Sequence, residues 1–194
     1  MSEMHELHRR AGGLLRRTVE RIRDEHWRHP TPCTEWDVRD LIHHIAWSNL
    51  WVAQLVEGRR LDEVEPELVG DVLGEDPIGV AVRSIDASST AFEKAAANTP
   101  VQISRGTVPA SEYCFERMND LTVHNWDLAR AIGLAVDLDP ECMRTSLDGF
   151  RSLEAMLRPL GALGPDVVVP SDADLQTRYL AFFGRTADWT PPAG

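Results

Sequence analysis

The sequence predicts an all-α protein, a four-helix bundle with additional short helices. Apolar residues recur every three or four positions over four segments of roughly 20 residues, with charged side chains between them. The one β-like run, residues 167–170, is too short to predict a sheet. No repeat or low-complexity stretch interrupts the pattern, so the helices are expected to share one core.

The N-terminal half should hold two long helices joined by a turn. The first is expected over 3–25, and the second over about 35–56, with Thr34 or Asp37 as its N-cap. A polar, acidic connection follows at 57–76 and has room for one short turn of helix. Its length argues for a crossover connection rather than simple up-and-down packing.

Glycine and proline residues separate the remaining predicted helices. They are expected, in order, over 77–97, 111–133, 139–157 and 174–189. Gly133 is a natural C-cap, and the last helix should end near Gly184. Residues 101–110 contain Gly106 and Pro109 and are interpreted as a loop or a short β excursion.

Bulk composition excludes several classes of partner. The 194 residues suffice for one good core, so we expect one domain over 1–194. With a formal net charge of −11, the chain lacks the excess of positive charge that binds nucleic acid or an anionic membrane. No apolar run approaches the roughly 20 residues of a membrane span, and the polar N-terminus lacks a signal-peptide core. Three scattered cysteines suit a reducing cytoplasm and argue against disulfides or a cysteine-rich zinc site.

Two adjacent histidines, His43 and His44, stand in an otherwise apolar helical stretch. On a helical wheel His44 lies at the shoulder of the core stripe, whereas His43 points to nearly the opposite side. The stripe itself consists of Leu41, Ile45, Ser48, Val52 and Leu55. Neighbouring positions do not share a helix face, so only His44 is expected to face the bundle.

A second polar pair, Asp120 and His124, shares one face of the 111–133 helix. A carboxylate and an imidazole on a largely apolar stripe are costly to bury unless they are paired or bound to metal. With His44 they make a candidate metal site of two histidines and one carboxylate, which leaves a position for water or substrate. The alternative is a half-buried Asp–His hydrogen bond and a core histidine satisfied by its neighbours.

Three segments resemble a known family. PTPCTEWDVRDLIHHIAWSN (30–49), DLTVHNWDLARAIG (120–133) and LAFFGRTADW (180–189) are similar to signatures of the DinB/YfiT-like metalloprotein superfamily. Within it they resemble the branch of the mycothiol-dependent maleylpyruvate isomerase N-terminal domain, with Ala187 where proline is usual. The resemblance implies a DinB-like bundle that holds a divalent metal through His44, Asp120 and His124. It also implies chemistry with a low-molecular-weight thiol such as mycothiol.

The sequence departs from that family in two respects. The isomerase has glutamate at the carboxylate position, whereas this chain has the shorter Asp120. The isomerase also carries an additional C-terminal domain, while this sequence ends soon after the expected bundle. The resemblance therefore leaves the substrate open. Imidazole and carboxylate ligands suit zinc, our first expectation, and also nickel or iron.

For several nearby residues the sequence leaves two roles open. Asp127 either orients a ligand histidine or pairs with Arg130 or a neighbouring helix. Arg117 either holds a substrate carboxylate or neutralises Asp120. Cys33 is either reactive or a small packed residue of its turn. Trp47 and Trp51 either wall a pocket beside the metal or fill a seam between helices. Packing is the role expected of Trp36, Trp126 and Trp189. No role is assigned to the histidines on polar helix faces or in a turn, which are His5, His8, His26 and His29.

Two classes of function follow. The first is a metal-dependent enzyme that acts on a small molecule, either a mycothiol-dependent transferase or isomerase or a YfiT-like hydrolase. The second is a bundle that binds metal or a small ligand without turnover. An enzyme should show a concave pocket over an open metal position, whereas a fourth protein ligand would argue for binding alone. The oligomeric state, monomer or homodimer, stays open.

Overall fold

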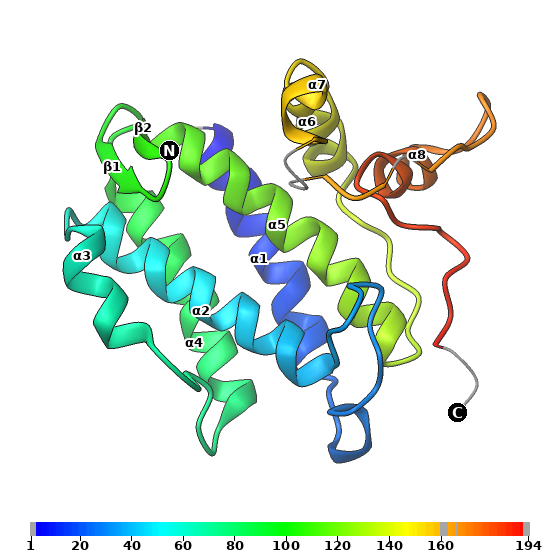
Figure 1. Cartoon of the computed structure of the whole chain (residues 1–194), viewed down its shortest axis with the longest axis horizontal. Coiled ribbons are helices and arrows are strands. Elements are labelled where there is room, and N and C mark those ends of the chain that lie inside the picture. Colours follow the sequence, from blue (N-terminus) through cyan, green and yellow to red (C-terminus); the bar gives the residue numbers. More distant parts are fainter. Residues whose placement is uncertain (1–2, 160–162, 166, 192–194) are drawn as a thin grey trace.

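The structure, a computed structural model, describes residues 3–159, 163–165 and 167–191. The predicted all-α class is confirmed. Four long helices dominate the described residues, and the strands found there form one two-stranded sheet (Figure 1). The long helices are α1 (Glu3–Val19), α2 (Val38–Val56), α4 (Pro77–Lys94) and α5 (Ala110–Ala131).

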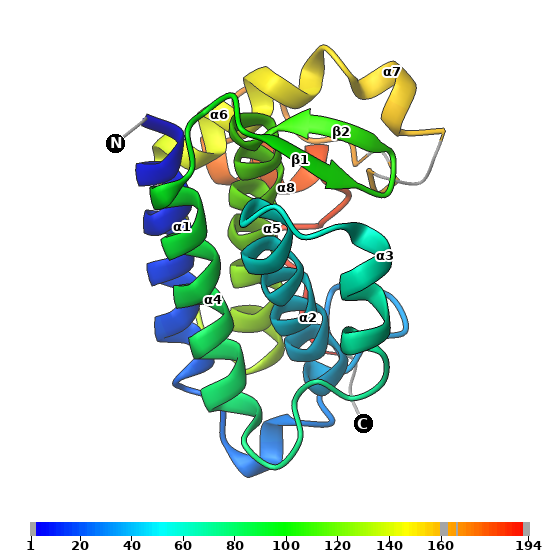
Figure 2. The same cartoon turned by 90° about the vertical axis from the view of Figure 1, so that its left-hand side faces the viewer.

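These four helices form the predicted bundle. Helix α1 packs against α4 and α5, and α2 packs against the same two helices, so the order around the bundle is α1, α4, α2, α5. Helices α2 and α4 both start at the same end of the bundle (Figure 2). The chain between them therefore returns along the bundle, which is the crossover that the long 57–76 connection predicts.

Short elements close the bundle at one end. The crossover holds α3 (Leu61–Val64) and the 3-10 helix η2 (Glu65–Leu68), which lie beside α2. Strands β1 (Pro100–Ile103) and β2 (Gly106–Pro109) pair antiparallel and lead directly into α5. Of the two interpretations of 101–110, the short β excursion is thus the correct one. The hairpin lies over the end of the bundle where α2 finishes and α5 begins (Figure 2).

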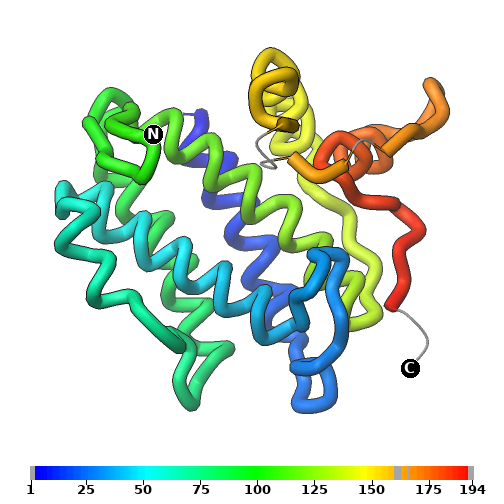
Figure 3. Tube along the Cα trace, viewed as in Figure 1, coloured from blue at the N-terminus to red at the C-terminus, as the bar shows by residue number. Residues whose placement is uncertain are grey.

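The C-terminal part packs on the outer side of α5 (Figure 3). It contains α6 (Pro140–Arg151), α7 (Glu154–Leu157) and α8 (Leu175–Phe182). The helix expected over 139–157 is therefore broken in two, between Arg151 and Glu154. Trp126 of α5 and Tyr179 of α8 belong to the apolar cluster that joins this part to the bundle.

The structure corrects the expected end of α1 and the expected start of α2. Helix α1 ends at Val19 rather than near residue 25, because the next amides of Arg21 and Ile22 bond to carbonyls three residues back, which tightens the last turn. A short 3-10 helix, η1 (Asp24–His26), follows. Helix α2 begins at Val38, since Asp37 rather than Thr34 is its N-cap. Helix α8 ends at Phe182, close to Gly184 as expected.

His5 and His8 correct a second expectation, because both are buried rather than on a polar face. His8 is only 1% exposed and lies edge-on to the Phe92 ring of α4, with 4.9 Å between ring centroids. Burial, helped by the charges of Arg117 and His5, lowers the pKa of His8 to about 3. His8 is therefore a neutral core residue at physiological pH.

None of the described helices combines the length and the apolar character that crossing a bilayer requires.

Candidate metal centre

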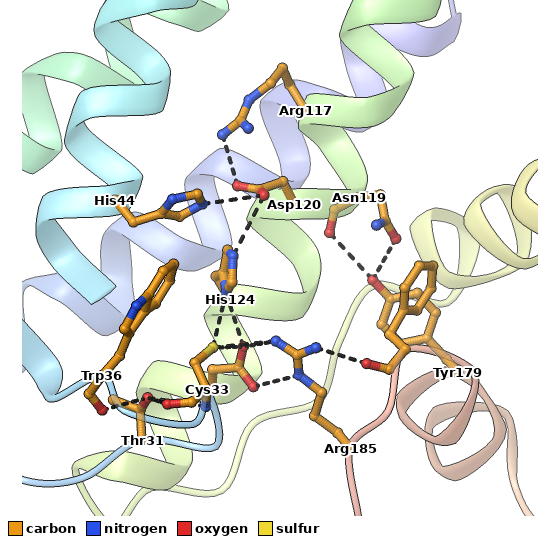
Figure 4. A network of polar contacts seen from close by, with 12 residues as sticks. Thr31, Cys33, Trp36, His44, Arg117, Asn119, Asp120, His124, Tyr179 and Arg185 are labelled. Carbon is orange, nitrogen blue, oxygen red and sulfur yellow. Dashed lines mark hydrogen bonds and ion pairs between the residues drawn. The ribbon is translucent and has the colours of Figure 1, made fainter. Parts of the chain in front are cut away.

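Helices α2 and α5 bring His44, Asp120 and His124 together (Figure 4). Asp120 Oδ1 lies 3.5 Å from His44 Nε2 and 3.5 Å from His124 Nε2. One ligand atom from each residue lies within 4.8 Å of the other two. His44 comes from the middle of α2, and the other two residues sit one turn apart on α5. The three predicted ligand residues therefore share one point between two facing helices.

The spacing of these atoms fits a metal better than hydrogen bonds. A separation of 3.5 Å is long for an N–H···O bond, whose usual length is about 2.7–3.2 Å. Tetrahedral zinc with ligand bonds of about 2.0–2.2 Å holds its ligand atoms roughly 3.4 Å apart. The donor set, two imidazoles and one carboxylate, suits zinc, nickel or iron.

A buried carboxylate fixes the orientation of His124. His124 Nδ1 donates to Asp127 Oδ2 at 2.9 Å, which leaves Nε2 directed at Asp120. Asp127 is fully buried and accepts from Arg185 twice, from Nε at 3.1 Å and from Nη2 at 2.8 Å. Asp127 thus orients the ring of His124, as in the first interpretation, and it also forms an ion pair with Arg185 from the segment after α8. Arg130 instead donates to the backbone oxygen of Trp189.

In the candidate centre, burial and nearby charges shift the pKa values of the side chains in opposite directions. Burial alone would raise the pKa of Asp120, but Arg117 and His124 hold it well below its usual range. Burial likewise opposes ionisation of Asp127, yet Arg185 and His124 lower its pKa to about 2. Burial would lower the pKa of His124, whereas Asp120 and further hydrogen bonds raise it well above its usual value. Both carboxylates are therefore ionised and paired with positive charge that is already present in the protein.

Arg117 contacts Asp120 directly. Its Nη2 donates to Asp120 Oδ2 at 2.7 Å, on the carboxylate oxygen that does not face the histidines. In the structure Arg117 thus neutralises Asp120, one of its two predicted interpretations. The other oxygen, Oδ1, is the one that faces both histidines.

Cys33 belongs to a second polar group beside the first. Its Sγ lies 3.2 Å from Asp127 Oδ2 and 3.9 Å from His124 Nδ1, so these three residues also converge. However, Arg185 Nη2 lies 3.3 Å from the same sulfur. A fixed guanidinium in contact with two of the three groups disfavours a cation there. We therefore take His44, Asp120 and His124 as the candidate metal centre.

A hollow lies over the outer side of His44. It has a volume of about 490 Å³ and includes Trp36, whose ring centroid is 5.0 Å from that of His44. Its other lining residues are Glu35, Asp40, His43, His44 and Trp47. Glu35 has a φ of +71°, a left-handed conformation that costs energy outside glycine. Within the described part of the chain, no fourth histidine, cysteine or carboxylate joins the three ligand atoms.

The outward histidine and the tryptophans behave largely as expected. His43 lies at the rim, where its Nε2 donates to Gly70 O at 2.9 Å. Trp47 donates to Leu68 O at 3.0 Å and packs edge-on against buried Trp51, with 5.4 Å between ring centroids. Both tryptophans line a cavity that Arg117 also lines, but none of the three candidate ligands lines it.

Comparison with known proteins decides the family. The family model for the mycothiol maleylpyruvate isomerase N-terminal domain matches residues 8–129, which include α2 and most of α5. The chain belongs to this family. The resemblance of the sequence motifs to the mycothiol maleylpyruvate isomerase branch is thereby confirmed. All three residues of the candidate centre lie within the matched region.

Two mycobacterial proteins match this chain over nearly their whole length. Two uncharacterized proteins of Mycobacterium tuberculosis, from strains CDC 1551 / Oshkosh and ATCC 25618 / H37Rv, are each 28% identical over 185 residues. Each match covers 92% of this chain and 96% of the relative.

Solved structures share the fold of this family member. The crystal structure of the mycothiol-dependent maleylpyruvate isomerase matches with a TM-score of 0.59 at 20% identity, and a single-residue mutant of it matches with 0.59 at 19%. The match covers 74% of this chain and 66% of the isomerase, so the chain spans just under two thirds of that protein. At this identity the likeness establishes the common fold.

Proposed function

We propose that this protein is a metal-dependent enzyme that uses a low-molecular-weight thiol, as a transferase or isomerase. Its divalent metal, zinc in the first instance, would be held by His44, Asp120 and His124. The observation that carries the proposal is the pair of 3.5 Å separations around Asp120 Oδ1, which suit a shared ion and are too long for good hydrogen bonds.

The protein's own residues prepare the site for that ion. Asp127 fixes the ring of His124 so that Nε2 faces the centre, and Arg185 holds Asp127 from the other side. Arg117 restrains the carboxylate of Asp120 through Oδ2. When bound, a divalent ion lowers the pKa of a coordinated thiol or water and polarises a carbonyl.

Membership of the family supports the use of a thiol. The solved relative is a mycothiol-dependent isomerase, and the family model bears the same enzyme's name. The hollow of about 490 Å³ beside His44 has room for a small molecule next to one of the three candidate ligands. An enzyme fits this hollow and the three-ligand set better than a binding-only bundle, in which a fourth protein ligand would close the site.

Metal content is the first test. Protein purified without an affinity tag is measured by mass spectrometry for wild type, His44→Ala and His43→Ala. We expect about one equivalent of metal in wild type and in His43→Ala, and loss of the metal in His44→Ala, since only His44 faces Asp120. No metal in wild type, even after reconstitution with zinc, nickel and iron, would reject the proposal.

Thiol binding is the second test. Mycothiol is titrated calorimetrically into the zinc-loaded protein in buffers of different ionisation enthalpy. A thiol that becomes a metal ligand loses its proton, so we expect release of about one proton at neutral pH. An analogue of mycothiol without the sulfur should bind more weakly and release none. Equal binding of the two compounds would exclude a thiol-dependent centre.

A further inference from the structure

A cavity lined by two tryptophans adjoins the candidate metal centre along the bundle. It has a volume of about 320 Å³ and lies between α2, α5, the crossover and the β1–β2 hairpin. Ser48 lines it one turn after His44 on α2. Arg117 lines it one turn before Asp120 on α5, and Figure 4 shows the bond between these two residues. A ligand in this cavity would therefore lie next to the centre, toward the hairpin end of the bundle.

Ser48 brings a free hydroxyl group to the cavity wall. The residue is only 5% exposed, and its Oγ makes no hydrogen bond within the described part of the chain. The indole nitrogen of Trp51 is sealed from solvent, whereas this oxygen keeps some accessible surface. Because Ser48 lines the cavity, a ligand there can reach the oxygen. A hydroxyl group both donates and accepts hydrogen bonds, so the charge of the ligand depends on the other groups of the lining.

Tyr113 brings a second free hydroxyl group, from α5. Its Oη also lacks a hydrogen-bond partner among the described residues and is not sealed from solvent. Burial raises the pKa of Tyr113, so this hydroxyl stays protonated at neutral pH. The charges that act on this pKa include those of Arg105, Glu116 and Arg117, which all line the cavity. The hydroxyl therefore lies beside the cavity, which two helices thus supply with free hydroxyl groups.

Aromatic rings form much of the remaining wall. Trp47 and Trp51 line the cavity from α2, and Tyr113 lines it from α5. The two indole rings meet edge-on, with 5.4 Å between centroids and 70° between planes, so they form a corner of the wall. The face of an aromatic ring carries negative potential and attracts an ammonium group, most strongly for tryptophan. The same rings also favour contact with a flat apolar group.

The charges at the cavity are negative on balance. The charged lining residues and the groups paired with them comprise four carboxylates and two guanidinium groups. Arg105 pairs with both Glu112 and Glu116. Arg117 pairs with the carboxylate of the candidate metal centre. Glu65, exposed at the rim, forms no ion pair within the described part of the chain. The field in the cavity therefore favours a cationic ligand over an anionic one.

We propose that this cavity binds a small aromatic primary amine in its protonated form. A primary ammonium group has three N–H donors, and Ser48 Oγ and Tyr113 Oη accept from them. The indole rings stabilise the charge and contact the ring of the ligand. Binding itself requires no metal, since none of the candidate metal ligands lines the cavity. The further step, that the amine belongs to the substrate of the metal centre, rests on the proposed function.

Benzylamine, which is protonated at neutral pH, is the probe for a direct test on the full chain. Its affinity is measured by calorimetry and compared with the affinities of benzyl alcohol and benzoate. Benzyl alcohol keeps the ring and a polar group without the charge, and it should bind at least about fivefold more weakly. Benzoate reverses the charge and should bind most weakly of the three. Binding of benzyl alcohol or benzoate as tight as that of benzylamine, or no benzylamine binding, would overturn the proposal.

Two conservative variants test the position of the amine. Ser48→Ala and Tyr113→Phe each remove a hydroxyl group and keep the rest of the wall. Each should bind benzylamine about tenfold more weakly, the effect of losing one hydrogen bond to a charged group. Ser84→Ala is the matched control, because this serine is also buried but its hydroxyl donates within α4, away from the cavity. It should bind benzylamine as wild type does. Wild-type affinity in both Ser48→Ala and Tyr113→Phe would contradict the proposed site.

His44→Ala separates this inference from the proposed function, because an amine can also coordinate a metal ion. Benzylamine binding that persists unchanged in His44→Ala places the amine in the cavity. Loss of binding in this variant, with an unchanged fold by circular dichroism, would assign the amine to the metal centre and overturn the cavity site. Wild type that binds benzylamine but takes up no metal rejects the proposed function alone. Metal uptake without benzylamine binding rejects the cavity site alone.

Discussion

Asp127 lies between His124 and Arg185 and is bonded to both. Its Oδ2 accepts from His124 Nδ1 at 2.9 Å and from Arg185 Nη2 at 2.8 Å. Residues more than 50 positions apart in the sequence thus meet at one buried carboxylate, because the segment after α8 returns to the end of α5. The orientation of a predicted metal ligand is therefore set partly from the C-terminal segment.

Asp127→Asn should weaken metal binding. The neutral amide is a poorer partner for the ring N–H of His124, so the imidazole is less firmly oriented and less basic at Nε2. We expect a 10–100-fold lower affinity for zinc, the usual effect of losing such a partner. The measurement is competition with a zinc-sensitive chelating dye. Asp137→Asn, at an exposed position after α5, is the control and should bind zinc as wild type.

Arg185→Gln should lower the free energy of unfolding. The substitution leaves the buried carboxylate of Asp127 without its cation, at a cost of about 3 kcal/mol in the free energy of unfolding. Urea denaturation measures this, with Arg178→Gln on the exposed face of α8 as the control. The double variant with Asp127→Asn should lose less than the sum of the two single variants. Strict additivity would mean that the two side chains are not coupled.

The helix pattern predicted the bundle and the three candidate ligands for the same reason. Periodic burial assigns a face to each residue of a long helix, so His44 could be separated from His43, and Asp120 could be placed with His124. Asp127 was within reach of the same reasoning because it is three residues from His124. These inferences need only local geometry and the assumption that two polar faces meet.

Arg185 escaped prediction because its role depends on tertiary structure. It follows the helix-ending Gly184, where no periodic face exists to show which way a side chain points. The available signal was a basic residue directly after that glycine, inside the 180–189 segment that resembles the family. His8 failed for the opposite reason, since its face of α1 was judged polar from neighbouring charges, while Phe92 of α4 covers it. Helix boundaries also shifted wherever short-range hydrogen bonds ended a turn early.

Cys33→Ala tests which of the two converging groups binds metal. If His44, Asp120 and His124 are the ligands, the variant should keep about one equivalent of zinc, because the sulfur lies on the Nδ1 side of His124 and not at Nε2. His124→Ala, which removes a residue common to both groups, should lose it. Loss of zinc in Cys33→Ala with an unchanged fold by circular dichroism would move the site to Cys33 and Asp127.

His8 should make the protein sensitive to mild acid. The unfolded chain protonates His8 below about pH 6.5, whereas the folded protein resists protonation down to about pH 3. The unfolded state therefore binds more protons in this window, and the free energy of unfolding falls as pH falls, by up to about 1.4 kcal/mol per pH unit. Above pH 6.5 the neutral form prevails in both states and the effect is absent.

His8→Leu should remove this sensitivity at similar volume. Between pH 7 and pH 5, metal-free wild type should lose about 2 kcal/mol more unfolding free energy than His8→Leu in urea titrations. His26→Gln, in the half-buried turn after α1, is the control and should follow wild type. Equal losses in wild type and His8→Leu would show that His8 accepts its proton in the folded protein, and that Phe92 and Arg117 do not keep it neutral.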